Sequence, residues 1–331
     1  MTRTLTYAEA MVEGLRDALI ADPNVHLMGG YFLGITEHRG LMADLHKDFP
    51  DRIYYPPIAE VGYVGAGIGA AMTGLRPFVD IATASFLFQG MAQVANEAAN
   101  IHYMSGGQTR VPVVFHLNHG IRGGGAAQHS HSPQAMLWNT PGLEIMTPAT
   151  PYDVKGLIRT ALLSDNPTCW LDHVGLFGVS GEVPEESYSI PFGQARIARS
   201  GSDVTLVASS LMVHRAMEAA ETLAAQGVEA EVVDLRTLNP LDETSILASV
   251  AKTGRVVVVD ECHLSCGVGA EIAARIADKA FGDLKAPVKR VATADVPVPF
   301  SAPLEDAIKP TAELVVEAAA EVVGTGAKAG V

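Results

Sequence analysis

Residues 57–67 read PIAEVGYVGAG, a stretch in which a single glutamate, Glu60, opens a glycine-rich helix after a predicted strand. Small residues recur at Gly62, Ala66 and Ala70, and they would let a neighbouring helix or a cofactor approach the backbone closely. A carboxylate at the start of such an apolar helix is costly to bury unless it has a chemical role. It could instead serve only to complement the positive end of the helix dipole. This stretch alone leaves both interpretations open.

The size and composition of the chain indicate a two-domain globular protein. At 331 residues it is longer than one ordinary hydrophobic core. Its composition, 48 % hydrophobic and 18 % charged, excludes a disordered chain. The net charge of −14 argues against nucleic acid as a partner. The sequence shows neither a basic-then-apolar leader nor an apolar run long enough to span a bilayer, so we expect a cytoplasmic protein without membrane contact.

The three cysteines, Cys169, Cys262 and Cys266, show no CxxC spacing. His263 stands between the last two, which could suggest a metal site. Zinc needs four ligands, however, and the neighbouring sequence supplies no second pair. We therefore expect three buried free thiols in a reducing compartment.

Strands alternate with helices along the chain, which is typical of a parallel sheet covered by helices on both faces. The first domain, residues 1–178, is predicted to contain strands at 25–28, 52–55, 78–81, 111–115, 143–146 and 168–171. Its predicted helices cover 6–20, 41–45, a segment from Glu60, 86–103 and 152–163. A capping box at Thr6–Glu9 begins the first of these helices.

The alternation of predicted strands and helices stops before residue 200, and the polar, turn-rich residues 179–200 are predicted to be a linker. The second domain, residues 201–331, is predicted to contain strands at 204–208, 228–234, 255–260 and 288–291. Its predicted helices cover 212–225, 242–250, 269–281 and 312–323. The predicted fold class is therefore α/β, with two three-layer αβα domains.

No phosphate-binding glycine motif is visible, because no strand is followed by GxGxxG opening a helix and no Walker lysine motif occurs. Residues 120–132 read GIRGGGAAQHSHS and follow a buried strand, where open α/β sheets bind ligands. His129 and His131 are too few for a metal site, and Ser130 and Ser132 lack a nucleophile elbow. A proton-handling histidine is the more consistent interpretation, although a loop histidine on a solvated surface fits the same residues.

Four segments carry a resemblance to a known family. They are PIAEVG at 57–62, YMSGG at 103–107, AQHS at 127–130 with PGL at 141–143, and GVGAEI at 267–272 with ADVP at 294–297. Through them, and nearly end to end, the chain resembles the β subunit of the decarboxylating component of 2-oxo acid dehydrogenase complexes. That family covers pyruvate, branched-chain 2-oxo acid and acetoin dehydrogenases. The resemblance implies a thiamine-binding pyrimidine domain followed by a transketolase C-terminal domain.

The same resemblance implies thiamine diphosphate as cofactor and assigns roles to individual residues. Glu60 matches the acid that hydrogen-bonds the pyrimidine ring nitrogen and favours the imino tautomer. Phe86 matches the aromatic residue that packs on the pyrimidine, and Gly30 and Gln89 match further cofactor-binding positions. His129 matches the active-site histidine, which is expected to handle protons or orient the acceptor when the acyl group leaves for a lipoyl arm.

The resemblance also implies partners. In such enzymes a Gly-Asp-Gly segment with a later Asn holds the diphosphate and its Mg²⁺, and this chain contains no such pair. Split members of the family take that segment from an α subunit. We therefore expect a half-site that is completed in an α2β2 heterotetramer, a small 2-oxo acid as substrate, and a lipoyl acyltransferase core as a further partner. Contacts between β subunits are expected through apolar helix faces such as Ile272, Ile276 and Ala280.

Members of the family bind a structural potassium ion through backbone carbonyls. The matching carbonyls in this chain are those of Val113, Ala161, Ser164 and Asn166.

The chain departs from the family pattern around the expected substrate mouth. Gly30 stands where the family usually has an acid, His131 where it often has Gln, and Asn139 where it often has His. We expect thiamine chemistry to be kept, with an unusual substrate or acyl acceptor.

Two other functions are compatible with parts of the pattern. The C-terminal half of a split transketolase-like carboligase would use the same acid, but sugar phosphates usually need clustered basic residues, and only Arg110 and Arg122 lie near the mouth. A non-catalytic scaffold that pairs with an α chain is a third hypothesis, and the retained site residues argue against it.

Overall fold

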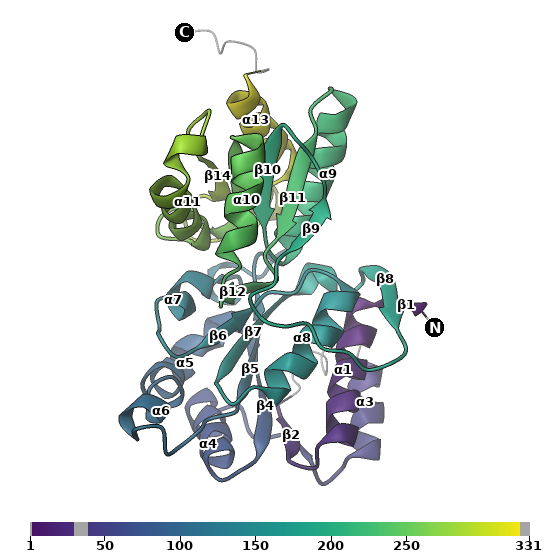
Figure 1. The fold of residues 1–331 in the computed structure, drawn as a ribbon. Coiled ribbons are helices and arrows are strands. Elements are labelled where there is room, and N and C mark those ends of the chain that lie inside the picture. The colour runs from purple at the N-terminus through teal and green to yellow at the C-terminus, as the bar shows by residue number, and fades with distance from the viewer. Residues whose placement is uncertain (1, 30–38, 325–331) are drawn as a thin grey trace. The chain divides into compact units, whose positions relative to one another are not determined.

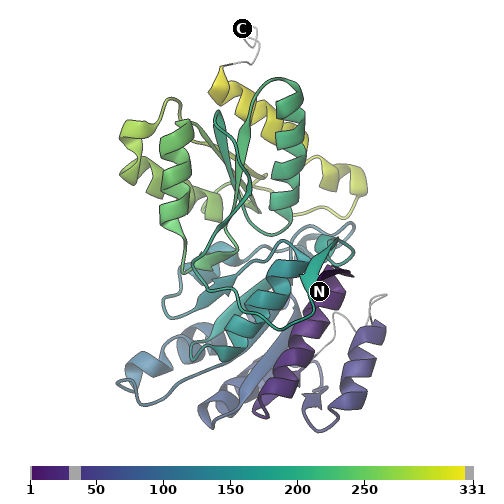
Figure 2. The same cartoon turned by 45° about the vertical axis from the view of Figure 1, so that its right-hand side comes forward.

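The computed structural model describes residues 2–29 and 39–324 (Figure 1). Of Arg39, only the backbone is described. The chain divides into two compact units. Unit 1 comprises Met1–His119, His129–Phe192 and Leu238–Pro240, and unit 2 comprises Gly120–Gln128, Gly193–Thr237 and Leu241–Val331. Each unit has a central sheet with helices on both faces (Figures 1 and 2), which confirms the predicted α/β class.

Unit 1 is built around one seven-stranded sheet. Its strands are β2 (Val25–Met28), β3 (Ile53–Tyr54), β4 (Arg76–Thr83), β5 (Val114–His119), β6 (Glu144–Met146), β7 (Thr168–His173) and β12 (Thr237–Asn239). They lie in the order β12-β6-β7-β5-β4-β2-β3, and all neighbours from β6 to β3 are parallel. The carboxyl ends of these strands therefore share one edge, which is where open parallel sheets bind ligands.

Helices cover both faces of this sheet (Figure 1). On one face lie α1 (Tyr7–Ala21), α3 (Arg39–Asp48) and α8 (Pro151–Leu163), and on the other lie α4 (Glu60–Met72), α5 (Leu87–Ala92) and α6 (Ile101–Met104). The predicted capping box is present, because the Thr6 hydroxyl accepts from the Glu9 amide while the Glu9 carboxylate accepts from the Thr6 amide. The shorter helical segments are η1 (Ala84–Phe86), η3 (Ala127–His129), α7 (Gln134–Trp138) and η4 (Val174–Leu176).

The helix predicted over 86–103 is not continuous. The π-helical segment η2 (Gln93–Ala98) separates α5 from α6. After it, the Ala99 amide donates to the Val94 carbonyl at 3.1 Å, a step of five residues in place of four. A single π-helical turn shifts the buried face of a helix by only one residue. The spacing of apolar residues in the sequence therefore does not reveal this interruption of the helix.

Unit 2 is built around a five-stranded sheet. Its strands are β9 (Arg196–Arg199), β10 (Val204–Ala208), β11 (Ala230–Asp234), β13 (Val256–His263) and β14 (Lys289–Thr293), in the order β14-β13-β10-β11-β9. Its helices are α9 (Leu211–Ala225), α10 (Glu243–Thr253), α11 (Val268–Lys279), α12 (Ala302–Asp306) and α13 (Ala312–Val323), with the short η5 (Phe281–Asp283). Figures 1 and 2 show α10 and α11 on one face of this sheet and α9 and α13 on the other.

Residues 179–200, which the sequence predicts to be a linker, contain two strands. β8 (Ser180–Pro184) pairs antiparallel with β1 (Thr2–Thr6), and β9 pairs antiparallel with β11. The buried ammonium of Lys155 organises the chain after β8, since it donates to the carbonyls of Pro184 (2.8 Å) and Glu186 (3.2 Å) and to the Glu13 carboxylate (2.7 Å). Long-range pairing of this kind leaves no periodic signal in a short polar segment.

Two predictions about unit 2 are wrong. Cys266 is exposed, because it lies in the turn between β13 and α11, whereas Cys169 and Cys262 are buried as predicted. The α11 residues predicted to contact a second β subunit point into the unit's own core instead, with Ile272 and Ile276 each 1 % exposed. An amphipathic helix covers its own sheet first, and only burial data distinguish that role from a subunit contact. Within the described ranges, no helix has both the length and the apolar character needed to cross a membrane.

The close approach of α4 to β4 yields a stability prediction. A methyl group added at Gly67 would lie 2.4 Å from Val79 Cγ2, whereas one added at Gly69 would meet nothing within 4 Å. We expect Gly67→Ala to lower the free energy of unfolding by about 1–3 kcal/mol, as overpacking does. Gly69→Ala should raise it by about 0.5–1 kcal/mol, since alanine is the better helix former. Urea denaturation of the isolated chain measures both, and equal stability of the two variants would contradict this packing.

Candidate active site

The candidate residues follow strands of the unit 1 sheet. Glu60 comes after β3 and begins α4, and Phe86 comes after β4 at the end of η1. His129 comes after β5, and it also lies in unit 1. These positions place all three side chains beyond the carboxyl ends of parallel strands, as expected for a ligand site in such a sheet.

Glu60 is half-buried at the amino end of α4. The cap residue is Ala59, and no side chain caps the helix, so capping does not account for the glutamate. Among residues 2–29 and 39–324, the Glu60 carboxylate makes no hydrogen bond or ion pair. A partly desolvated carboxylate at a helix amino end is thus available to a ligand that donates or accepts a proton.

Phe86 packs against His129 in an edge-to-face arrangement, with ring centroids 5.4 Å apart and an interplanar angle of 77°. A second, similar pair lies beside it, because Phe88 and His131 have centroids 5.1 Å apart at 76°. His131 Nδ1 also lies 2.8 Å from Ser85 Oγ. The segment 85–88 and the segment 129–131 are therefore packed together at two successive ring contacts, which fixes His129 beside Phe86.

Gln89 is exposed on α5 and directly precedes Gly90, where α5 crosses α4. At that crossing a methyl group added to Gly90 would lie 3.2 Å from Val64 Cγ2 of α4. The helix that carries Gln89 therefore packs directly on the helix that begins with Glu60. The fourth cofactor-binding residue predicted from the sequence, Gly30, lies outside the described residues.

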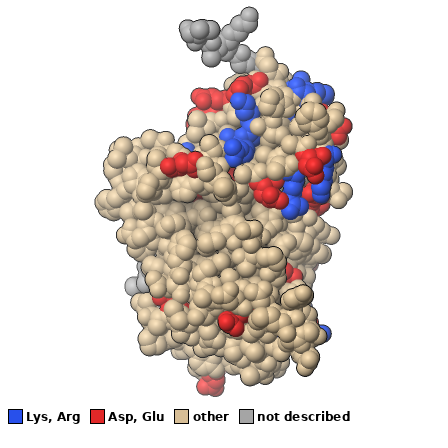
Figure 3. Space-filling view, turned by 90° about the vertical axis from the view of Figure 1, so that its left-hand side faces the viewer, with Lys and Arg blue, Asp and Glu red and all other residues tan. Residues whose placement is uncertain are grey.

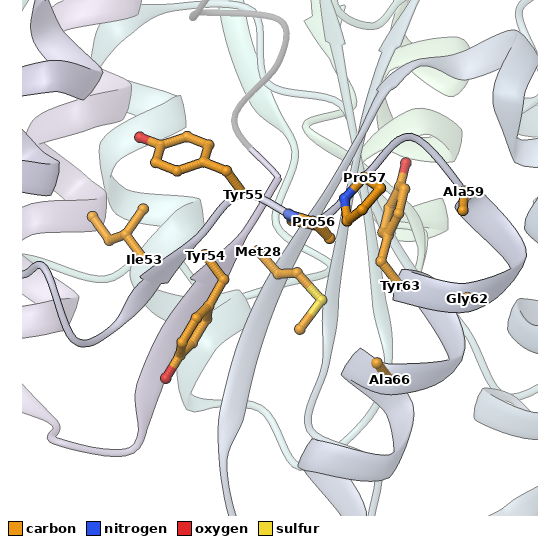
Figure 4. Close-up of a pocket in the computed structure, with 10 residues that line it drawn as sticks. All are labelled: Met28, Ile53, Tyr54, Tyr55, Pro56, Pro57, Ala59, Gly62, Tyr63 and Ala66. Atoms are coloured by element: carbon orange, nitrogen blue, oxygen red, sulfur yellow. The ribbon is translucent and has the colours of Figure 1, made fainter.

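A pocket of about 610 Å³ lies beside α4 (Figure 4). Small residues of α4, Gly62 and Ala66, form one side of it, and Met28 projects into the space between this helix and the segment Tyr54–Pro57. The lining is predominantly apolar. Glu60, Phe86, Gln89 and His129 are not among its lining residues, so the pocket adds an apolar surface next to the Glu60 helix and supplies no acid.

The glycine loop predicted to face a ligand is held by the chain's own carboxylates. Within unit 2, the amides of Gly123 and Gly124 donate to the two oxygens of Glu305, each at 2.8 Å. The Ile121 amide donates to Glu261 at 3.0 Å. Both glycines have positive φ, 79° and 80°, which turns successive amides toward one anion. A concavity that could hold a phosphate is therefore already filled by a buried glutamate.

The polar residues around His129 do not form a nucleophilic dyad or a metal site. Ser130 Oγ is buried without a hydrogen-bond partner among the described residues, and Ser132 Oγ lies 3.5 Å from His119 Nδ1. No group of three or more His, Cys, Asp or Glu side chains with metal-binding geometry occurs in the described part of the chain. These observations agree with the expectation that His129 belongs to neither a dyad nor a metal site, and its proton-handling role stays a prediction.

The carbonyls predicted to hold potassium come from two places in unit 1. Val113 precedes β5, and its carbonyl accepts from the Thr168 amide at 2.9 Å. Ala161 lies in the last turn of α8, and Ser164 and Asn166 lie in the turn that follows it. The Ser164 carbonyl accepts from Arg76 Nη1 at 2.8 Å. One of the predicted potassium ligands is therefore already bound to a guanidinium.

Sequence reasoning missed one polar cluster altogether. Asp80, His116 and Asp172 lie side by side on β4, β5 and β7 and are 0 % exposed. The signal was present in residues 116–119, HLNH, because two histidines and an asparagine in a strand between other buried strands must each find a polar partner.

Comparison with known proteins agrees with this geometry. Residues 3–176 match the pyrimidine binding domain of transketolase, and residues 193–327 match its C-terminal domain. The chain is 42 % identical to the β subunit of acetoin:2,6-dichlorophenolindophenol oxidoreductase from Cupriavidus necator, over 96 % of this chain and 97 % of that one. It is 41 % identical to the β subunit of the pyruvate dehydrogenase E1 component from Rickettsia felis, over 96 % and 98 %.

The chain belongs to this family of dehydrogenase β subunits. The resemblance seen in the sequence is thereby confirmed. Among solved structures, a split-gene transketolase described as an inactive β4 tetramer superimposes with a TM-score of 0.80, covering 97 % of this chain and 98 % of that one. At 24 % identity it supports the two-domain fold, and the family assignment rests on the closer relatives.

The Glu305 contact yields a second stability prediction. We expect Glu305→Gln to lower the free energy of unfolding by about 1–3 kcal/mol, because one of the two glycine amides would face an amide group in place of an oxygen. The amides of Gly123 and Gly124 should then exchange with deuterium faster. Glu317→Gln, an exposed change on α13, is the matched control and should leave both readings unaltered. Unchanged exchange at the two glycines in the Glu305 variant would contradict the assigned role.

Proposed function

We propose that this chain is the β subunit of a thiamine-diphosphate-dependent 2-oxo acid dehydrogenase. The observation that carries the proposal is the half-buried carboxylate of Glu60, which has no partner among the described residues, on a helix of a pyrimidine-binding domain. The named relatives are acetoin and pyruvate dehydrogenase β subunits, which supports the same reaction class. When bound, the cofactor supplies the nucleophilic carbon and the electron sink that decarboxylation of a 2-oxo acid requires.

The chain's own residues then have separate roles. Glu60 holds a proton at the pyrimidine ring nitrogen, a task suited to a carboxyl group shielded partly from water. Phe86 packs on the flat pyrimidine ring, and Gln89 and Gly30 contribute further contacts to it. His129, held against Phe86 at 5.4 Å, moves a proton at the substrate or the acyl acceptor.

The substrate is proposed to be a small 2-oxo acid, with a lipoyl group or another acceptor for the acyl group. His131 supports an unusual substrate or acceptor, because it packs on Phe88 and contacts Ser85 next to the Phe86–His129 pair. A residue that departs from the family pattern therefore lies beside the proposed catalytic histidine. Gly30 and the exposed Asn139 are the other departures.

An α subunit is the proposed partner that supplies the diphosphate and Mg²⁺ site. In this chain the glycine amides suited to an anion are bound to Glu305, and the described residues hold no cluster of metal ligands. The face of unit 1 around α4–α6 is nearly free of charged residues (Figure 3). Large apolar side chains are exposed in the same region: Ile58, Val61, Met72, Phe88, Tyr103 and Met104. Exposed apolar surface of this extent marks protein interfaces.

The remaining parts of the proposal concern assembly and ions. An α2β2 heterotetramer and docking to a lipoyl acyltransferase core extend the family resemblance, and the acidic net charge of −14 suits a basic partner domain. Potassium is proposed to bind through the carbonyls of Val113, Ala161, Ser164 and Asn166.

Replacement of Glu60 tests the catalytic role. In the complex with the α subunit, Glu60→Gln should lower kcat by about 10²–10⁴-fold, because the amide cannot exchange a proton with the pyrimidine. Steady-state decarboxylation of 2-oxo acids measures the loss. Glu185→Gln, an exposed change in the same unit, should keep wild-type activity. A scaffold would lose no activity with either change, and full activity of the Glu60 variant would overturn the proposal.

Calorimetric titration of thiamine diphosphate with Mg²⁺ tests the half-site. The chain alone should show no binding, and the addition of an α-type partner should restore it, since the anion and metal ligands come from the partner. Tight binding to the chain alone would disprove the split site. The same titration in potassium chloride and in sodium chloride tests the potassium proposal, which expects tighter binding in potassium.

A further inference from the structure

The buried cluster at the centre of unit 1 contains a histidine clamped between two carboxylates. His116 Nδ1 lies 3.0 Å from Asp80 Oδ1, and His116 Nε2 lies 3.1 Å from Asp172 Oδ2. Asp80 is directly opposite His116 in the β4–β5 ladder, and all three side chains are 0 % exposed. Because carboxylates accept hydrogen bonds, both ring nitrogens act as donors, which requires the imidazolium form.

The charge of the cluster agrees with this protonation state. Burial by itself would lower the pKa of His116, but the hydrogen bonds that its ring donates to Asp172 and Asp80 outweigh this effect and raise the pKa to about 9. The folded-state pKa is therefore above the value of about 6.5 in an unfolded chain. The stabilising contribution of the cation is complete below a pH of about 6.5, and it is lost as the pH rises through 9.

Two neutral donors, Tyr7 and Trp170, also contact the cluster. The Tyr7 hydroxyl of α1 donates to Asp172 Oδ1, and Trp170 Nε1 of β7 donates to the same oxygen at 2.6 Å. Burial and the charge of Asp172, with a smaller contribution from Asp153 of α8, raise the pKa of Tyr7 well above its usual value. Phe78 of β4 stacks on the imidazole at 5.5 Å. Asp172 thus accepts from three donors, and Asp80 accepts from His116 and from one backbone amide.

That backbone amide connects the cluster to the proposed active site. Asp80 Oδ1 also accepts from the Ala82 amide at 2.8 Å. Ala82 has φ 64°, a left-handed conformation that is unfavourable for alanine, and the register between β4 and β5 shifts between Asp80 and Thr83. η1 follows at once and ends at Phe86. The Asp80 side chain therefore holds the strained bulge of β4 that leads into η1 and Phe86.

We propose that His116 is a positioning residue, whose cation holds Asp80 and thereby fixes the bulge at Ala82 that leads into η1 and Phe86. The proposal rests on the function proposed above only for its consequence, that cofactor binding depends on His116. The positioning itself concerns the chain alone. Loss of the cation would remove the imidazolium counter-charge from the buried Asp80 carboxylate, so the carboxylate and the bulge it holds would rearrange together.

The direct test follows the Phe86 ring in the full-length chain, labelled with 4-fluorophenylalanine and observed by fluorine NMR. Phe86→Leu assigns the resonance, and the exposed Phe281 of unit 2 serves as internal reference. In the wild type, the Phe86 resonance should shift with a midpoint near pH 9. In His116→Gln it should be displaced at pH 7 and lose this midpoint. His116→Arg should restore the position at pH 7 without a midpoint, since a guanidinium keeps its proton.

Two further variants separate positioning from general stability. Tyr7→Phe removes a donor to Asp172 and should lower the unfolding temperature while the Phe86 resonance stays in place. If His116→Gln lowers the unfolding temperature in the same way without moving the resonance, the proposal is wrong. If His116→Gln does not fold, Asp80→Asn decides, because loss of that charge should bring the wild-type midpoint down from pH 9. An unchanged midpoint overturns the proposal.

Cofactor binding links the result to function. In the complex with the α subunit, His116→Gln should raise the Kd for thiamine diphosphate by about 10–100-fold, as a small misplacement of a positioning group does. An unchanged Kd would overturn the link to the cofactor. If the fluorine result holds while the wild-type complex binds no thiamine diphosphate, the proposed function fails and the positioning role stands.

Discussion

The clamp of His116 between Asp80 and Asp172 ties three central strands of unit 1 together at the edge where the candidate site lies. A fully buried cation between two carboxylates is stable only if every partner is present, because removal of one leaves a buried charge without compensation. One carboxylate that binds His116, that of Asp80, also holds the left-handed bulge at Ala82. The core of the sheet and the position of Phe86 therefore depend on one hydrogen-bonded network.

The candidate site contains groups that are available to a ligand, and it also contains an anion-binding loop that the chain itself occupies. Glu60 offers a carboxylate that no other residue within 2–29 and 39–324 binds, and the ring of Phe86 packs against that of His129. The backbone amides that could bind an anion are occupied by Glu305, and that carboxylate is itself buried. This division suits a chain that handles the proton chemistry of a cofactor while another chain holds its diphosphate and metal.

Most of the fold could be predicted from the sequence, and most of the site could be predicted only through resemblance. Alternating strand and helix patterns located the sheets because burial on both faces leaves apolar runs, as in β10 and the first half of β13. The capping box at Thr6 also followed from local chemistry. The π-helical segment after Ala92, the pairing of β8 with β1, and the exposure of Cys266 did not, because each depends on contacts with residues distant in the sequence or on one extra residue in a turn.

The sequence by itself determined which residue types were available: one glutamate before a glycine-rich helix, one histidine after a glycine loop, and no diphosphate motif. Only the tertiary structure decided how they are used. In it, Glu305 binds the amides of the glycine loop, and Ile272 and Ile276 are buried in the core. His116 lies between two carboxylates. The physical reason is that periodicity reports which face of an element is buried, whereas hydrogen-bond partners and charge states are set by neighbours brought together from far along the chain.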